Sequence, residues 1–148
     1  MTNGSILLVE DNPDDQKLTL RALKKNHIAN EVVLAEDGAQ ALEYLFGTGQ
    51  FAGRAVEEPP ALVLLDLKLP KVDGLSVLAQ IRADERTKTV PVVVLTSSAE
   101  EQDLVKSYEL GVSSYVQKPV DFVEFVEAAR QIGLYWLVLN KHPRAHGL

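Results

Sequence analysis

The sequence contains no cysteine, one tryptophan and one methionine among its 148 residues. The absence of cysteine excludes a disulfide framework and a thiolate zinc site, and it is typical of a protein from a reducing compartment. No stretch contains the roughly 18 consecutive apolar residues that a membrane-spanning helix requires. The N-terminal stretch MTNGSILLVEDN lacks the basic start and the long apolar core of a signal peptide. We therefore expect a cytoplasmic protein.

Basic charge is also scarce. The chain has 15 Lys and Arg residues against 21 Asp and Glu, for a net charge of −6. This balance argues against a broad surface for nucleic acid, so direct DNA binding is not expected. With 46% hydrophobic residues, the chain is long enough for one domain with a substantial core, and we expect residues 1–148 to form a single unit.

Short apolar runs of strand length recur at wide spacing along the chain. Runs that are apolar on both sides are typical of strands covered by helices on both faces, as in parallel sheets. The four strong runs are SILLVE at 5–10, EVVLAE at 31–36, ALVLLD at 61–66 and PVVVLT at 91–96, and a weaker run, SSYVQK, spans 113–118.

Helical patterns lie between these runs. The predicted helices span 14–26, 38–47, 74–85 and 99–110, with Gly111 as the stop of the last one, and a longer helix runs from Asp121 towards Asn140. The connection at 47–60 is long and is predicted to loop over the surface. The alternation predicts an α/β fold: a doubly wound sheet of five parallel strands with right-handed crossovers.

Charged and hydroxyl residues stand where these predicted strands end, which is where open parallel sheets bind ligands. They are Glu10, Asp11, Asp66, Thr96 and Lys118. If the first and third strands are neighbours, three carboxylates lie close together, and unit charges about 4 Å apart repel by roughly 4 kcal/mol at an effective dielectric near 20. Such a cluster needs a cation. Oxygen ligands without histidine or cysteine favour a hard ion, Mg²⁺ first.

In this setting Asp66 is interpreted as a nucleophile, because carboxylates form acyl phosphates. Lys118 would then supply a second positive charge, and the Thr96 hydroxyl would donate to a phosphoryl oxygen. The alternative is that each residue simply ends a strand at the solvent boundary. It is weaker, since all five residues fall at successive strand ends.

The segments LLVEDN, VLLDLKLPKVDG, VVVLTSS and YVQKP have the order and approximate spacing of the response-regulator receiver family of two-component signalling. The resemblance covers residues 5 to about 130. It implies a flavodoxin-like strand order of 2-1-3-4-5. It also implies a signalling phosphoprotein that is not an enzyme beyond assisting its own phosphotransfer and autodephosphorylation.

The resemblance implies a role for each matching residue. Asp66 would accept the phosphoryl group of a sensor histidine kinase. Asp11 would bind Mg²⁺ directly, Glu10 would act largely through water, and the main-chain carbonyl of Lys68 would be a third metal ligand. The remaining roles fall to Thr96 as switch hydroxyl, Lys118 as phosphate-binding lysine and Tyr115 as aromatic switch. For Tyr115, an ordinary half-buried strand tyrosine is the alternative.

The C-terminal part, about 131–148, is expected to extend the last helix. Its residues from Ile132 to Leu139 are apolar all round, which indicates burial on every side. We expect a homodimer surface there, formed by Tyr135, Trp136, Leu137 and Leu139. The alternative is that the tail folds back over its own domain. With no second output domain expected, signalling would proceed by protein contact. The long connection and apolar tail resemble single-domain regulators paired with bacterial phytochrome histidine kinases.

Other functions fit the residues less well. A haloacid-dehalogenase phosphohydrolase would need an acid two residues after its aspartate, where this chain has Lys68. A flavodoxin-like cofactor binder would need amides, hydroxyls or glycine where the first strand opens into acids. A calcium loop starting at Glu10 fails because Asp15 stands where glycine is required. A dimerisation scaffold without a phosphorylation role is disfavoured by the intact set of five strand-end residues.

Overall fold

The computed structural model describes residues 4–25, 30–54, 58–69, 72–96, 98–117 and 123. The strands are β1 (Ile6–Val9), β2 (Val32–Ala35), β3 (Leu62–Asp66), β4 (Val92–Thr96) and β5 (Ser114–Gln117). The helices within this part of the chain are α1 (Pro13–Lys25), α2 (Gly38–Phe46), α3 (Gly74–Ala83), α4 (Ala99–Ser107) and the short 3₁₀ helix η1 (Gly49–Phe51).

The five strands form one parallel sheet in the order β2-β1-β3-β4-β5. Strand β1 pairs with two neighbours, so that Ile6 lies opposite both Val32 and Leu62. This order confirms the predicted fold. Because β1 and β3 are neighbours, their carboxyl ends meet at one edge of the sheet, as the predicted carboxylate cluster requires.

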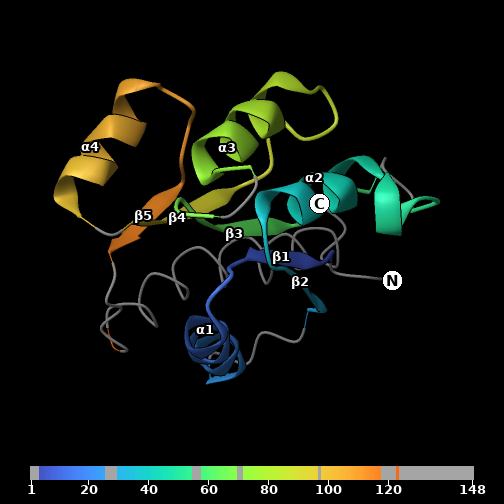
Figure 1. The fold of residues 1–148 in the computed structure, drawn as a ribbon, viewed down its shortest axis with the longest axis horizontal. Coiled ribbons are helices and arrows are strands. Elements are labelled where there is room, and N and C mark those ends of the chain that lie inside the picture. The colour runs from blue at the N-terminus through green and yellow to red at the C-terminus, as the bar shows by residue number, and fades with distance from the viewer. Residues whose placement is uncertain are drawn as a thin grey trace, which may run out of the picture.

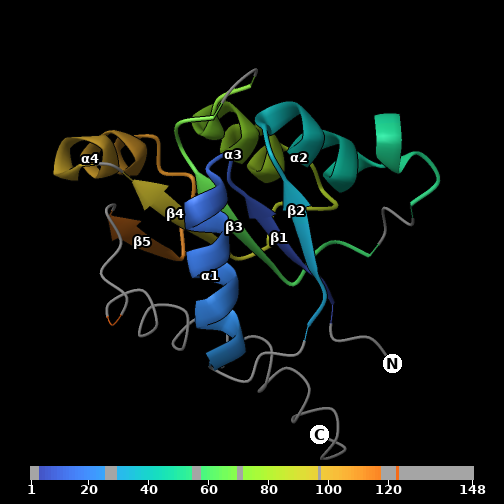
Figure 2. The same cartoon turned by 60° about the horizontal axis from the view of Figure 1, so that its bottom comes forward.

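Helices cover both faces of the sheet. Figure 1 shows α2, α3 and α4 on one face and α1 on the other, and the turned view in Figure 2 agrees. Two hydrophobic clusters match these layers. The larger includes Leu45 of α2, Val77 of α3 and Val105 of α4, whereas the smaller includes Leu23 of α1. Strands β1, β3 and β4 are fully buried, which explains their continuous apolar sequence.

Three helices begin at capping side chains. Asp37, Asp73 and Ser98 each accept a hydrogen bond from the main-chain N–H three residues later, at the starts of α2, α3 and α4. These caps satisfy N–H groups that have no partner within the helix. The caps thereby fix where each of these helices begins.

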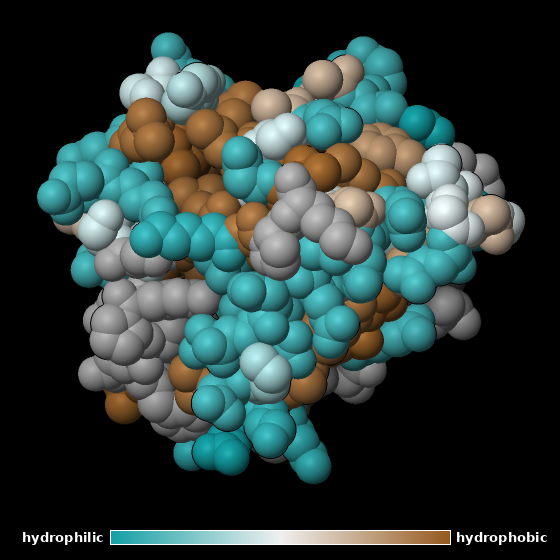
Figure 3. Space-filling model, viewed as in Figure 1, coloured by the Kyte–Doolittle hydropathy of each residue, from teal (hydrophilic) through white to brown (hydrophobic). Residues whose placement is uncertain are grey.

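Helix α4 is the least buried of the four α-helices that the structure describes. Val105 is its one buried residue, while Leu104 is 52% exposed and Tyr108, just after the helix, is 55% exposed. Figure 3 shows hydrophobic residues at the surface between α3 and α4. The predicted end at residue 110 is wrong: the helix ends at Ser107 because Glu109 has a left-handed φ of 52°.

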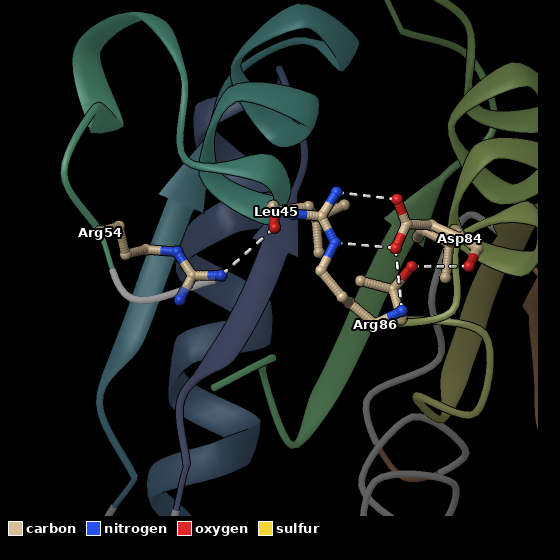
Figure 4. A network of polar contacts seen from close by, with 6 residues as sticks. Leu45, Arg54, Asp84 and Arg86 are labelled. Carbon is tan, nitrogen blue, oxygen red and sulfur yellow. Dashed lines mark hydrogen bonds and ion pairs between the residues drawn. The ribbon is translucent and has the colours of Figure 1, made fainter. Parts of the chain in front are cut away.

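The connection after α2 is held against that helix by Arg54. Its guanidinium donates from Nε to the Tyr44 carbonyl at 2.6 Å and from Nη2 to the Leu45 carbonyl at 3.4 Å, the latter drawn in Figure 4. The same group lies 4.2 Å from the centroid of the Tyr44 ring, and Phe51 meets that ring edge-on. A cation at the C-terminal end of a helix is favourable, so Arg54 fixes the start of the long connection.

Among the described residues, no helix combines the length and the apolar character needed to cross a membrane. The predicted C-terminal helix from Asp121 lies outside the described residues, apart from Val123.

Candidate functional site

Three carboxylates meet at the carboxyl ends of β1 and β3. Glu10 and Asp11 follow β1 directly, and Asp66 is the last residue of β3. One carboxylate oxygen from each of these residues lies within 4.8 Å of the other two. Glu10 and Asp66 are almost completely buried, whereas Asp11 is exposed. The structure thus brings together the three acidic residues that the sequence singled out.

Glu10 is held by the first turn of α1. The main-chain N–H of Asn12 donates to Glu10 Oε2 at 3.1 Å, and the side-chain amide of Gln16 donates to the Glu10 carbonyl at 2.8 Å. Asn12 also starts the helix, because its Oδ1 accepts from the N–H groups of Asp14 and Asp15 at 2.8 and 3.1 Å. The corner between β1 and α1 therefore fixes the position of the buried carboxylate.

Asp66 is held by the segment that follows it. The main-chain N–H of Lys68 donates to Asp66 Oδ1 at 3.1 Å, and the N–H of Gly74 donates to the Leu67 carbonyl at 2.9 Å. The chain therefore folds back on itself just after Asp66. A glycine is needed at 74, because a Cβ there would lie 2.4 Å from the Asp66 carbonyl oxygen.

Thr96 ends the neighbouring strand β4 and carries a buried hydroxyl. Its side chain is fully buried, and its Oγ1 has no hydrogen-bond partner among the residues that the structure describes. Leaving a buried hydroxyl without a partner costs about 1–3 kcal/mol, so a ligand atom or a water at this position would stabilise it. Ser98 differs, since its hydroxyl accepts from the Glu101 N–H and caps α4.

Tyr115 lies on β5 opposite Val94 of β4. Because side chains alternate along a strand, Thr96 and Tyr115 lie on the same face of the sheet. Tyr115 is half-buried, and its burial raises the pKa of the phenol above its ordinary value. The Lys106 ammonium lies 5.4 Å from the centroid of its ring.

Several predicted residues lie outside the described part of the chain. They are Lys118 and the four residues of the expected dimer surface, Tyr135, Trp136, Leu137 and Leu139. Lys68, whose carbonyl was predicted as a metal ligand, is described and exposed, and it follows Asp66 in the turn.

Sequence reasoning missed two residues of this site. An asparagine followed by proline at the start of a helical pattern is a recognisable capping signal, and it could have identified Asn12. The contact of Gln16 with the Glu10 carbonyl depends on how α1 packs against β1. No local pattern in the sequence indicates such a contact.

The chemistry of the donor set fits a divalent cation. The converging groups are all carboxylates, and a hard ion prefers oxygen ligands of this kind. Burial of two of the three raises the cost of their mutual repulsion, because charges are screened less in the interior than in water. A bound cation would remove that cost, and the exposed side of Asp11 leaves the cluster open to solvent.

Comparison with known families supports this interpretation. The model of the response regulator receiver domain matches residues 6–130. The chain belongs to this family, whose members are signalling proteins of two-component systems and are phosphorylated by histidine kinases. The phosphohydrolase, cofactor-binder and scaffold alternatives are therefore not favoured.

Curated relatives match most of the chain, and some of them also match along most of their own length. The probable methanogenesis regulatory protein FilR2 of Methanothrix harundinacea is 42% identical over 93% of this chain and 86% of its own length. The response regulator Rcp1 of Synechocystis is 39% identical over 95% of this chain and 93% of its own length.

Solved structures give the same result. The bacteriophytochrome response regulator RtBRR is 54% identical with a TM-score of 0.83, covering 92% of this chain and 81% of its own. The phosphorylated cyanobacterial phytochrome response regulator RcpA is 40% identical with a TM-score of 0.76, and the Mn²⁺-bound form of Rcp1 is 39% identical with the same score. Each of these two covers 90% of this chain and 94% of its own.

Proposed function

We propose that Asp66 accepts a phosphoryl group from the phosphohistidine of a sensor kinase. One observation carries this proposal: a buried Asp66 carboxylate lies within 4.8 Å of two other carboxylates, at the open edge of the sheet. An oxygen of Asp66 attacks phosphorus, a new O–P bond forms and the P–N bond to the kinase imidazole breaks. The electron pair of that bond stays with the imidazole nitrogen. The product is an aspartyl phosphate.

The proposed cofactor is Mg²⁺. Asp11 and Asp66 would hold it directly, with Glu10 acting largely through water and the Lys68 main-chain carbonyl as a further ligand. When bound, the ion offsets the negative charge of the incoming phosphoryl group. The tethering of Glu10 by Asn12 and of Asp66 by Lys68 supports this assignment, because it orients the carboxylates before the ion arrives.

Thr96 and Lys118 are proposed to receive the phosphoryl oxygens. The buried Thr96 hydroxyl has no hydrogen-bond partner among the described residues, so a phosphoryl oxygen would satisfy it. Lys118 would add a positive charge, a role inferred from its place in the YVQKP segment. Movement of Thr96 towards the phosphoryl group would change the space next to Tyr115, which shares its face of the sheet. In this way phosphorylation at the site would change the conformation of the surface around α4 and β5.

Helix α1 is proposed to be part of the kinase contact. It begins directly after the carboxylates, and its exposed residues include Lys17, Leu20 and Arg21. Leu20 is 42% exposed. The protein as a whole has a net charge of −6, so basic residues around an exposed leucine stand out on its surface. They would attract an acidic partner surface, and the leucine would add an apolar contact. A kinase that brings its phosphohistidine to Asp66 must cover this region.

The proposed kinase is a phytochrome. This pairing is supported by RtBRR, a bacteriophytochrome response regulator, and RcpA, a cyanobacterial phytochrome response regulator. FilR2, at 42% identity, is a probable methanogenesis regulatory protein, so a comparison of several kinases tests the pairing. We further propose that the protein is a homodimer through Tyr135, Trp136, Leu137 and Leu139, and that its output is a change in protein contacts.

Two assays test this function. Phosphorylation by acetyl phosphate should require Mg²⁺ and should be absent from Asp66→Asn. A phosphotransfer profile against several histidine kinases should then show fastest transfer from a phytochrome. Equal transfer from all kinases, or fastest transfer from an unrelated one, would contradict the pairing and leave the role of Asp66 intact.

A further inference from the structure

Gly38, the first residue of α2, lies unusually close to the segment that follows Asp66. Its φ is outside the left-handed region, so its backbone conformation does not require glycine. The lack of space beside Gly38, however, does require glycine. A Cβ built on Gly38 would lie 1.8 Å from the main-chain oxygen of Val72 and 2.8 Å from Val72 Cβ. Because the nearest atom belongs to the backbone, no side-chain rotation can relieve this contact.

The start of α2 is itself firmly placed. The Asp37 side chain accepts from the Gln40 N–H at 2.8 Å and caps the helix, and Asp37 is buried. Two residues earlier, the Ala35 carbonyl accepts from the Glu10 N–H at 3.0 Å. The N-terminus of α2 is thus tied to the same strand end that carries the carboxylate cluster. A larger residue at 38 would therefore move Val72 more readily than it would move α2.

Val72 lies between Lys68 and Gly74. At one end of this segment the Lys68 N–H contacts Asp66, and at the other the Gly74 N–H donates to the Leu67 carbonyl. The Val72 side chain also packs against the larger hydrophobic cluster. A displacement of Val72 would therefore also move the turn at Lys68. This turn carries the Lys68 carbonyl, and its main-chain N–H orients Asp66.

We propose that Gly38 is a positioning residue for the metal site: its missing side chain lets the segment after Asp66 pack against α2 in the conformation that binds Mg²⁺. The inference rests on the proposed function, since it assumes that Glu10, Asp11, Asp66 and the Lys68 carbonyl hold the ion. The atoms nearest to a Cβ at Gly38 belong to Val72 and not to any of these groups. It lies 28 residues before Asp66 in the sequence.

The test compares two glycine substitutions in the full-length protein. Gly38→Ala should weaken Mg²⁺ binding roughly tenfold, the size of effect seen when a group that supports a metal ligand is lost. Gly53→Ala is the control. A Cβ at Gly53 meets nothing within 4 Å, but its φ of 94° strains any other residue. It should therefore lower thermal stability while leaving the Mg²⁺ dissociation constant within about twofold of wild type. Calorimetric titration with Mg²⁺ and thermal unfolding provide the two readouts.

A second measurement uses the wild-type protein alone, in case Gly38→Ala does not fold. Titration with Mg²⁺ should shift the amide resonance of Gly38 together with those of Lys68 and Gly74, and should leave that of Gly53 in place. Unchanged Mg²⁺ affinity in a folded Gly38→Ala, or an unmoved Gly38 resonance in wild type, overturns the inference while the proposed function stands. Failure of wild type to bind Mg²⁺ overturns both.

Discussion

The main-chain N–H of Asn12 donates a 3.1 Å hydrogen bond to Oε2 of Glu10, while the Asn12 side chain caps α1. One residue thus joins the stability of a helix to the orientation of a buried carboxylate.

We expect Asn12→Ala to lower the free energy of unfolding by about 1 kcal/mol through loss of the cap, and to weaken Mg²⁺ binding because the Asn12 N–H is no longer held in place. Asn12→Ser, which can still cap the helix, should retain most of both properties. Denaturant unfolding and Mg²⁺ titration of the two variants check this. Full Mg²⁺ affinity in a destabilised Asn12→Ala would show that the cap does not position Glu10.

Arg82 of α3 joins two connections at the opposite end of the strands. Its guanidinium donates to four main-chain carbonyls, those of Lys88, Val90, Leu110 and Gly111, at 2.6–3.0 Å. Partial burial lowers the pKa of this arginine below its ordinary value by desolvation. The four carbonyl oxygens replace part of the hydration that the guanidinium has lost. Arg82→Ala should lower the free energy of unfolding by about 3 kcal/mol, and Arg82→Lys by less, since an ammonium has three donors.

Mg²⁺ titration of the same two variants provides the control for Arg82. Because Arg82 is remote from the carboxylates, the Mg²⁺ affinity of folded Arg82→Lys should equal that of wild type. A loss of less than about 1 kcal/mol in Arg82→Ala would mean that water replaces the guanidinium at these carbonyls.

Asp84 and Arg86 form a bidentate pair, with Nε and Nη2 of Arg86 at 2.9 and 2.8 Å from the two carboxylate oxygens (Figure 4). The side-chain hydrogen bonds of Arg86, followed by its main-chain N–H, lower the pKa of Asp84 from 3.8 to about 2. A depressed pKa means that the folded state favours the ionised carboxylate. The resulting stabilisation is present above pH 3.8 and is lost as the pH falls towards about 2.

Arg86→Gln tests this pair. The variant should move the Asp84 pKa back towards its ordinary value, and an NMR titration of the Asp84 carboxyl resonance measures the change directly. The stability difference between wild type and variant should shrink as the pH falls from about 4 to about 2. An Asp84 pKa that is the same in both proteins would show that solvent screens this exposed pair completely.

Charge reversal on α1 separates kinase docking from the chemistry of the site. Lys17→Glu with Arg21→Glu should slow phosphotransfer from a cognate kinase by roughly tenfold, because both residues would face an acidic partner surface. Phosphorylation by acetyl phosphate should stay unchanged, since a small donor needs no docking surface. Lys88→Glu reverses a single charge at the far end of the strands, and it should leave both rates as in wild type. Equal slowing with the small donor would place the effect in the site and not in docking.

Sequence reasoning predicted most of the fold because the strands are buried on both faces. Their continuous apolar runs are visible without a structure, and the acids after β1 and β3 stand out against them. The limits of α4 could not be predicted, since Leu104 and Tyr108 have the spacing of core residues but are exposed. The helix ends just before Glu109, which adopts a left-handed backbone conformation at what is usually a glycine position. The nearest glycine in the sequence, Gly111, lies two residues further on and therefore predicts a later end.

The supporting contacts of the site were less accessible from sequence. Gly38 was predicted only as a helix start, and its contact with Val72 requires knowledge of how α2 sits beside the segment after β3. Arg82 lies in the predicted helix 74–85 and Arg54 in the predicted loop 47–60, and the sequence assigns neither residue a partner. In the structure, both bind main-chain carbonyls. Such contacts join separate elements of the chain, so the hydrophobic periodicity within one element does not predict them.

The central claim is that Asp66 is the phosphoryl acceptor. The most direct test is intact-mass analysis of wild type and Asp66→Asn after incubation with acetyl phosphate, with Mg²⁺ and with a chelator in its place. We predict a gain of one phosphoryl group in wild type with Mg²⁺, and no gain with the chelator or in Asp66→Asn. An unmodified wild type, or the same gain in Asp66→Asn, would contradict the claim.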